Sequence, residues 1–142
     1  MYKNLLLSFI IGSCCFNIFS HWIGLYRYIE NGIAYKTKSD NFKFKIFAFY
    51  TILSTVYYGL MNTLITYLRI KYKYNINIIY LIVSIISGSL IVIHNLYLKI
   101  LWDSYEFNTM NQKIIYAVKV FLTHFINYNF IMKGLEIYLN PI

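Results

Sequence analysis

Long apolar runs without a charged side chain alternate with short polar and basic segments along this chain. The clearest run covers residues 78–98 and ends at Lys99. At 1.5 Å rise per residue, a helix of that length extends roughly 30 Å, which matches the hydrocarbon core of a bilayer. The pattern therefore predicts a helix that crosses a membrane.

Three further runs predict helices of the same kind. Residues 5–25 and 46–68 carry no charge, and residues 114–132 carry only Lys119, whose long side chain can snorkel toward the helix end. The predicted fold is all-α, an integral membrane helical bundle with about four transmembrane helices. It forms a single domain over residues 1–142, with helices at about 5–25, 46–68, 78–98 and 114–132 and a short tail from residue 133.

The last three predicted helices each carry a stripe of polar or small residues at helical spacing. Because an unpaired hydroxyl or amide costs a few kcal/mol in hydrocarbon, the stripes are predicted to face one another. Gly59 and Gly88 are expected to let helix backbones approach closely. The stripes comprise Thr51, Thr55, Tyr58, Asn62 and Thr66 on 46–68; Tyr80, Ser84, Ser87, Gly88, His94 and Asn95 on 78–98; and Tyr116, Lys119, Thr123 and Asn127 on 114–132, with His124 about 60–80° away.

Composition supports lipid as the main surrounding of the chain. The hydrophobic fraction is 59% and the charged fraction 13%, whereas an ordinary soluble domain has roughly 25% charged residues. The net charge is +8, but the basic residues lie between the apolar runs, where membrane helices keep their cations near lipid phosphates. Membrane lipids are therefore the predicted partners, and nucleic acid is not. Five basic residues on one side against seven on the other leave the orientation open.

The stripes admit two interpretations, interhelical hydrogen bonding or a polar cavity that admits a lipid head group. No metal-ligand spacing occurs, and the adjacent Cys14 and Cys15 indicate no disulfide framework, so neither metal nor cofactor is predicted. None of the predicted spans contains Asp or Glu, which argues against a proton pump. Nucleophilic catalysis would need a hydroxyl beside a base, and Thr51, Ser54 or Thr55 with His94 or His124 offers that combination.

A series of short motifs follows along the chain in a fixed order: Phe42–Lys43–Phe44, Tyr57–Tyr58–Gly59, Gly88, Trp102–Asp103, Glu106, Leu122–Thr123–His124 and Glu136. This order resembles the androgen-induced gene and androgen-dependent TFPI-regulating protein family. The resemblance covers nearly all of this chain and about the first two-thirds of a typical member. Members are multi-pass endomembrane proteins, and some are threonine hydrolases that cleave fatty acid esters of hydroxy fatty acids.

Both catalytic positions depart from the family pattern. The family's Asn-His-x-x-His-Thr motif falls on residues 123–128, so its first histidine is His124 and its second, the catalytic one, falls on Asn127. The catalytic threonine falls on Ile46 or Phe47, and Thr51 lies about one turn further on. The resemblance thus implies either an inactive relative or a hydrolase that uses Thr51 and His124.

These observations lead to two functional expectations. The first is a lipid-related protein of an internal membrane, such as the endoplasmic reticulum, that hydrolyses acyl esters. Thr51 would be the nucleophile and His124 the base, with Asn127 or Asn95 polarising the carbonyl. The second is a non-catalytic membrane subunit or scaffold that packs into a larger assembly of membrane proteins.

Overall fold

The computed structural model describes residues 1–23, 40–98 and 109–142, without the side chains of residues 16–23, 40–44, 46, 47, 50, 95 and 98. Polar loops are expected at residues 27–45 and 103–108. Residues 27–39 and 103–108 lie outside the described residues, as does the Asn95 side chain, and residues 40–45 are helix rather than loop. Within the described ranges the chain is helical and contains no strand, which confirms the all-α prediction. The elements are α1 (Tyr2–Ile23), α4 (Asp40–Tyr72), α5 (Ile76–Ile93), the π-helical η1 (His94–Leu98), α6 (Met110–Ile126), the π-helical η2 (Asn127–Met132) and α7 (Lys133–Leu139).

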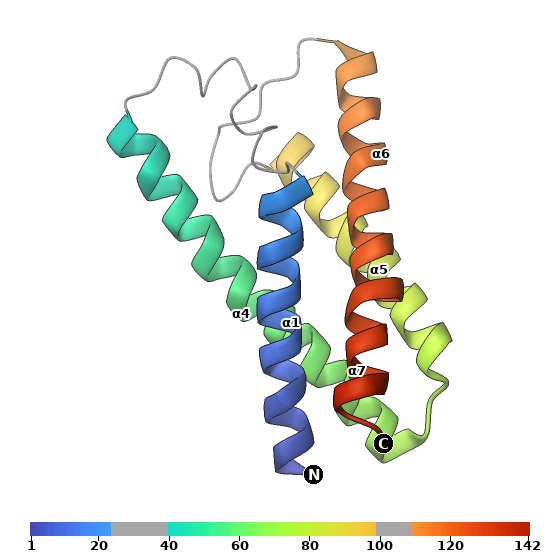
Figure 1. Ribbon diagram of the computed structural model, residues 1–142. Coiled ribbons are helices and arrows are strands. Elements are labelled where there is room, and N and C mark those ends of the chain that lie inside the picture. Colours follow the sequence, from blue (N-terminus) through green and yellow to red (C-terminus); the bar gives the residue numbers. More distant parts are fainter. Residues whose placement is uncertain (24–39, 99–108) are drawn as a thin grey trace.

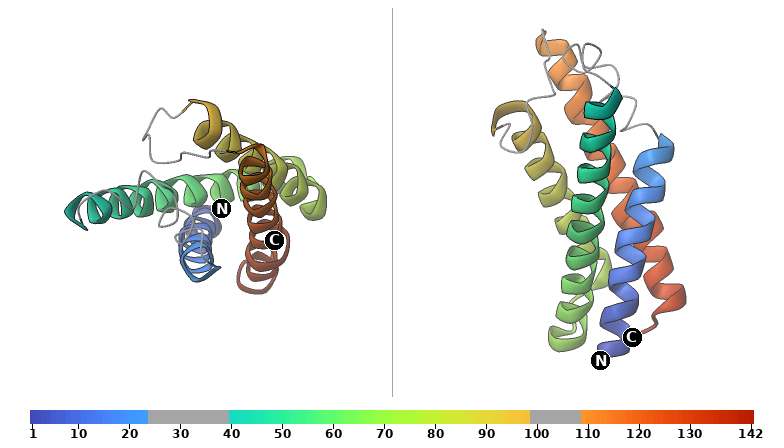
Figure 2. Two further views of the ribbon diagram at one scale, coloured as in Figure 1. Left: turned by 90° about the horizontal axis from the view of Figure 1, so that it is seen from above. Right: turned by 90° about the vertical axis from the view of Figure 1, so that its left-hand side faces the viewer.

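The helices run alternately up and down through the bundle (Figure 1). α6, η2 and α7 follow one another without a break and form one long helix. α4 crosses the other helices obliquely, and its first half diverges from α5 and α6 (Figures 1 and 2). Both chain ends and the turn between α4 and α5 lie at the same end of the bundle, which we call the termini end (Figure 1).

Two of the helices begin with side-chain caps. The Asn75 side chain accepts a hydrogen bond from the backbone N–H of Asn77 at 2.8 Å and caps α5. Thr109 and Gln112 form a capping box at the start of α6, in which each side chain bonds the backbone of the other residue at 3.3 Å. These caps satisfy N–H groups that have no partner within the first helical turn.

Glycines set the distance between α1 and α4. A Cβ on Gly12 would lie 2.7 Å from the Asn62 Cβ and would collide with the Tyr58 carbonyl oxygen. A Cβ on Gly59 would meet Ser13 and Phe9 in the same way, and one on Gly88 would lie 2.9 Å from the Phe121 ring. The expected close approach at Gly59 and Gly88 is confirmed, and Gly12 adds a third such position.

Tyrosine provides half of the residues in the core cluster. Outward positions on α4, α5 and α6 are apolar and exposed, so the bundle is more polar inside than on these outer faces. The clustered core residues are Tyr58, Ile65, Ile79, Tyr80, Tyr128 and Met132.

Two described helices are long and apolar enough to cross a membrane, Ile76–Ile93 and Met110–Leu139. The apolar stretch Tyr2–Cys15 of α1 is shorter. Core helices of soluble proteins can match them in length and composition. The described residues therefore contain two candidate membrane spans, whereas the sequence predicts about four.

The fourth helix differs from the prediction in its extent and in its inward face. It begins at Met110 rather than 114 and continues through α7 to Leu139, so residues 133–139 are helix and not tail. Lys119 is exposed, whereas His124 is fully buried. The buried line recurs at every fourth residue: Tyr116, Val120, His124, Tyr128, Met132, Glu136 and Asn140.

The π-helical segment η2 explains why that line stays inward. In an α-helix, residues four apart drift by about 40° around the axis at each step. A π-helical turn, closed by i→i+5 hydrogen bonds, is wound more loosely and takes up part of this drift. With the π-helical turn in place, residues spaced by four stay in the interior as far as Glu136. In an uninterrupted α-helix, the same spacing would carry Glu136 away from the interior.

Candidate functional site

The most extensive polar group in the interior surrounds Glu136, and we call it the Glu136 cluster. It draws Ser8 from α1, Asn62 and Thr66 from α4, Tyr80 from α5, and Glu136 and Asn140 from the last helix; all six residues are buried. The cluster thus joins every long helix of the bundle near the termini end.

Asn62 is the centre of this cluster. Its Nδ2 donates to the Glu136 Oε1 and to the Ser8 backbone carbonyl, both at 2.8 Å. Its Oδ1 accepts from the Tyr80 hydroxyl at 2.6 Å. A single amide therefore links α4 to three other helices and uses donor and acceptor at once.

The second oxygen of Glu136 is also paired. The Asn140 Nδ2 donates to the Glu136 Oε2 at 2.9 Å, and also to the Ser8 Oγ at 2.9 Å. Ser8 Oγ in turn donates to Thr66 Oγ1 at 2.7 Å. The Arg69 Nη1 lies 4.0 Å from Oε2, and the Arg69 side chain is only 10% exposed. Because N–H groups surround the carboxylate, the cluster presents no oxygen cage that would suit a metal cation.

A second polar group lies further into the bundle and contains Tyr57, Tyr58, Ser87, His124 and Tyr128. The Tyr58 hydroxyl lies 2.6 Å from the His124 Nε2, and the Val120 carbonyl lies 2.8 Å from Nδ1. A carbonyl only accepts, so Nδ1 carries a proton and, in the neutral ring, Nε2 accepts from Tyr58. The base atom of His124 is therefore occupied by a tyrosine hydroxyl.

Thr51 lies some distance along α4 from Tyr58, the residue that contacts His124. Thr51 precedes Tyr58 by seven residues, which corresponds to about 10 Å along the helix axis. It is half-buried, and its backbone carbonyl accepts from the Thr55 hydroxyl at 2.7 Å. Both ring nitrogens of His124 are already hydrogen-bonded, Nε2 to Tyr58 and Nδ1 to Val120, and neither of these two bonds involves Thr51.

Asn127, the third predicted catalytic residue, is fully buried where η2 begins. Neither its Nδ2 nor its Oδ1 has a hydrogen-bond partner. A buried amide without partners loses its hydration and gains nothing in return, at a cost of roughly 1–3 kcal/mol for each group. Such a group in a native structure calls for an explanation, and a water or ligand would supply one.

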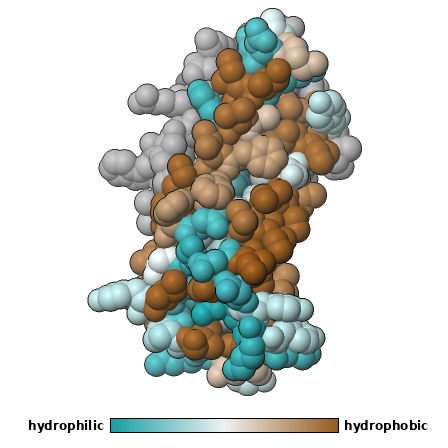
Figure 3. Space-filling view, turned by 90° about the vertical axis from the view of Figure 1, so that its right-hand side faces the viewer, coloured by the Kyte–Doolittle hydropathy of each residue, from teal (hydrophilic) through white to brown (hydrophobic). Residues whose placement is uncertain are grey.

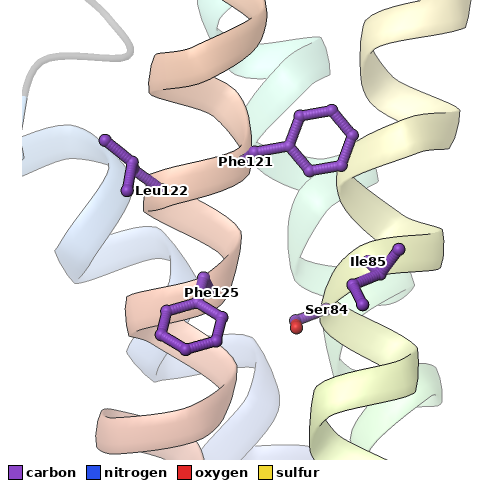
Figure 4. Close-up of a pocket in the computed structure, with 5 residues that line it drawn as sticks. All are labelled: Ser84, Ile85, Phe121, Leu122 and Phe125. Atoms are coloured by element: carbon purple, nitrogen blue, oxygen red, sulfur yellow. The ribbon is translucent and has the colours of Figure 1, made fainter.

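A cavity of about 230 Å³ lies between α5 and α6 (Figure 4). Ser84 is the polar member of its lining; its hydroxyl donates to the Leu81 carbonyl at 2.8 Å and accepts from Asn129 at 3.1 Å. With both bonds made inside the bundle, this hydroxyl is not activated as a nucleophile. The lining residues are Ser84, Ile85, Phe121, Leu122 and Phe125, so none of the three predicted catalytic residues lines it.

Among the described residues, no group of three or more His, Cys, Asp and Glu side chains is placed to hold a metal ion. No protein family, no curated protein and no solved structure matches this chain. The family resemblance and the activity that it implies are therefore proposals.

The Glu136 cluster is not predicted from the sequence, because the expected fourth helix ends at residue 132. The predicted spans contain no carboxylate, whereas Glu136 lies inside the long last helix of the structure. The four-residue interval from Tyr116 to Asn140 is the signal that could have revealed it.

Removing the Tyr58 hydroxyl should destabilise the bundle through His124. In Tyr58→Phe, the buried Nε2 loses its donor, and we expect a loss of about 1–2 kcal/mol in the free energy of unfolding. Tyr57→Phe is the matched control, because the Tyr57 hydroxyl is half-buried and its bond to Ser87 is longer, at 3.3 Å. Denaturant titration of both variants in detergent micelles measures the difference. Equal losses would show that the contact with His124 is not the stronger one.

Proposed function

We propose that this chain is a four-helix integral membrane protein that serves as a non-catalytic subunit or scaffold of a larger membrane assembly. The observation that carries the proposal is the direction of the polar side chains. Polar side chains of α4, α5 and the last helix meet inside the bundle: Tyr58 bonds His124, and Tyr80 bonds Asn62. Further stripe residues bond buried polar groups of the last helix.

The outer faces support a lipid environment. Only 28% of the residues of Ile76–Ile93 are buried, and only 39% of those in the most apolar stretch of Met110–Leu139. A core helix of a soluble protein would be mostly buried, and water would penalise so large an apolar surface. The exposed residues on these faces include Ile52, Leu53, Val56, Leu60 and Leu64 on α4; Leu81, Ile82, Ile85, Ile86 and Leu90 on α5; and Ile114, Ile115, Val118, Leu122 and Phe125 on α6.

α1 and α4 complete the proposed four crossings. α1 has 22 residues and α4 has 33, which at 1.5 Å per residue gives about 33 Å and 50 Å. Both lengths exceed the roughly 30 Å hydrocarbon thickness, and the oblique course of α4 accommodates its greater length. Polar contacts between α1 and α4, such as Ser13 Oγ donating to the Thr55 carbonyl at 2.9 Å, then lie away from lipid.

A second candidate function is the acyl-ester hydrolase of an internal membrane that the family resemblance implies. The unpaired amide of buried Asn127 favours it, since this residue was assigned to polarise a substrate carbonyl. Against it stands the bond between Tyr58 and His124, which would have to open before His124 could act as a base for Thr51.

One experiment separates these candidates. Membranes that contain the full chain are treated with a fluorophosphonate probe, in parallel with the Thr51→Ala and His124→Gln variants. We expect no labelling of any of the three, and recovery of the chain in the membrane fraction after washing at high pH. Labelling of the unaltered chain that both variants abolish would establish the hydrolase. Release of the chain by the wash would overturn the membrane-spanning arrangement itself.

A further inference from the structure

Tyrosines gather on the surface of the termini end. Tyr2 and Tyr138 are 83% and 82% exposed, and Tyr72 and Tyr74 are also exposed beside the α4–α5 turn. The Tyr72 and Tyr74 rings stack with centroids 5.7 Å apart. Amphipathic rings collect at the level of lipid head groups, so these four residues mark where a bilayer surface would lie.

Lysines surround the same end. Lys3, Lys71 and Lys73 are exposed, and Lys133 is half-buried, with its ammonium donating to the Asn77 Oδ1 at 3.1 Å. The one acidic side chain described at this end, Glu136, is fully buried and bonded within its cluster. No described carboxylate side chain therefore neutralises the lysines at this surface. Hydrophilic residues gather toward the same end in the space-filling view, below a broad hydrophobic surface (Figure 3).

Aromatic rings hold one of these cations in position. The Lys71 Nζ lies 5.4 Å from the centroid of the Tyr67 ring and 5.2 Å from that of Tyr72. Both distances are within the range of a cation–π contact. The ammonium is thus kept at the level of the tyrosine rings, where lipid phosphates would lie.

Lys73 occupies a backbone conformation that favours glycine. Its φ is 58°, and it is the one non-glycine residue with a positive φ among those described. A lysine in the left-handed region costs more than a glycine would. Such strain at an exposed turn is consistent with a side chain retained for its charge.

We propose that the termini end binds the head groups of anionic phospholipids through Lys3, Lys71, Lys73 and Lys133. The inference depends on the membrane-spanning arrangement proposed above. Charge complementarity selects an anionic head group, and the tyrosines at the same level select a lipid over a soluble anion or an acidic protein segment.

Native mass spectrometry of the full chain in mixed micelles of phosphatidylglycerol and phosphatidylcholine tests this proposal. We expect phosphatidylglycerol to be retained in excess. The preference should fall roughly fivefold for each lysine removed, and so more than tenfold in the K71Q/K73Q variant. K45Q/K113Q is the matched control, since it removes two cations near the starts of α4 and α6 at the opposite end; its preference should fall clearly less than that of K71Q/K73Q.

Lys73→Gly separates the charge from the fold. It should lower the lipid preference roughly fivefold while leaving the thermal transition unchanged or higher, because glycine relieves the positive φ. Glycerol phosphate in excess should not displace the bound lipid; displacement would identify a free-anion site and overturn the proposal. Equal retention of both lipids, or equal effects of the two double variants, would also overturn it. Failure to retain either lipid would instead contradict the membrane-spanning arrangement.

Discussion

Asn62→Leu is expected to destabilise the bundle by about 4 kcal/mol, because it leaves several buried groups without partners at once. The Glu136 Oε1 would lose its amide donor, and the Tyr80 hydroxyl would lose its acceptor. Leucine has a similar volume, so the loss would report hydrogen bonding rather than a cavity. Unfolding in mixed micelles, followed by circular dichroism, measures the change.

Asn127→Leu provides the matched control, with the same substitution at an equally buried position. Because neither amide atom of Asn127 has a partner, leucine should stabilise the bundle by about 1 kcal/mol or more. The two variants should therefore differ in sign. If Asn127→Leu destabilised the protein as strongly as Asn62→Leu, a bound water or ligand on Asn127 would be indicated. That result would favour the hydrolase candidate.

Gly12→Ala is expected to destabilise the bundle by about 3 kcal/mol, through the separation of α1 and α4. The added Cβ would meet the backbone of Tyr58, and a backbone atom cannot turn aside as a flexible side chain can. The free energy of unfolding, measured in the same mixed micelles, reports the loss.

Gly134→Ala is the control for this glycine. Nothing lies within 4 Å of a Cβ at Gly134, and its helical position should gain up to about 1 kcal/mol from the higher helix propensity of alanine. A loss at Gly134 as large as that at Gly12 would indicate that chain stiffness, not helix contact, determines the effect.

The inward faces of α4 and α5 were largely predictable from the sequence. Tyr58, Asn62 and Thr66 on α4 are buried as predicted, and so are Tyr80 and Ser87 on α5. Polar residues among apolar ones are a clear signal when the helix is regular, because 100° per residue places them on one side. On the last helix Tyr116, Thr123 and Asn127 are buried as predicted. Lys119 is exposed instead, and His124, which was placed 60–80° away from the stripe, is fully buried.

Pairing between helices could not be predicted. Periodicity indicates which face of a helix is buried, but not how far one helix is shifted along its neighbour. Thr51, Tyr58 and Asn62 share one predicted side of α4, and only the packing decides that Tyr58 is the one that meets His124. Asn140 was missed for a related reason, since its partners Ser8 and Asn4 are more than 130 residues away in the sequence.

The π-helical segment also constrains how the length of this chain can vary. A π-helical segment is an α-helix that holds one extra residue, with a smaller turn per residue. Loss of one residue within η2 would let the segment close as ordinary α-helix, and the helix after it would keep nearly its present orientation. Glu136 would still face Asn62, so a related sequence with a one-residue gap between positions 127 and 132 can keep the acidic residue, whereas the same gap elsewhere in the last helix would turn it away.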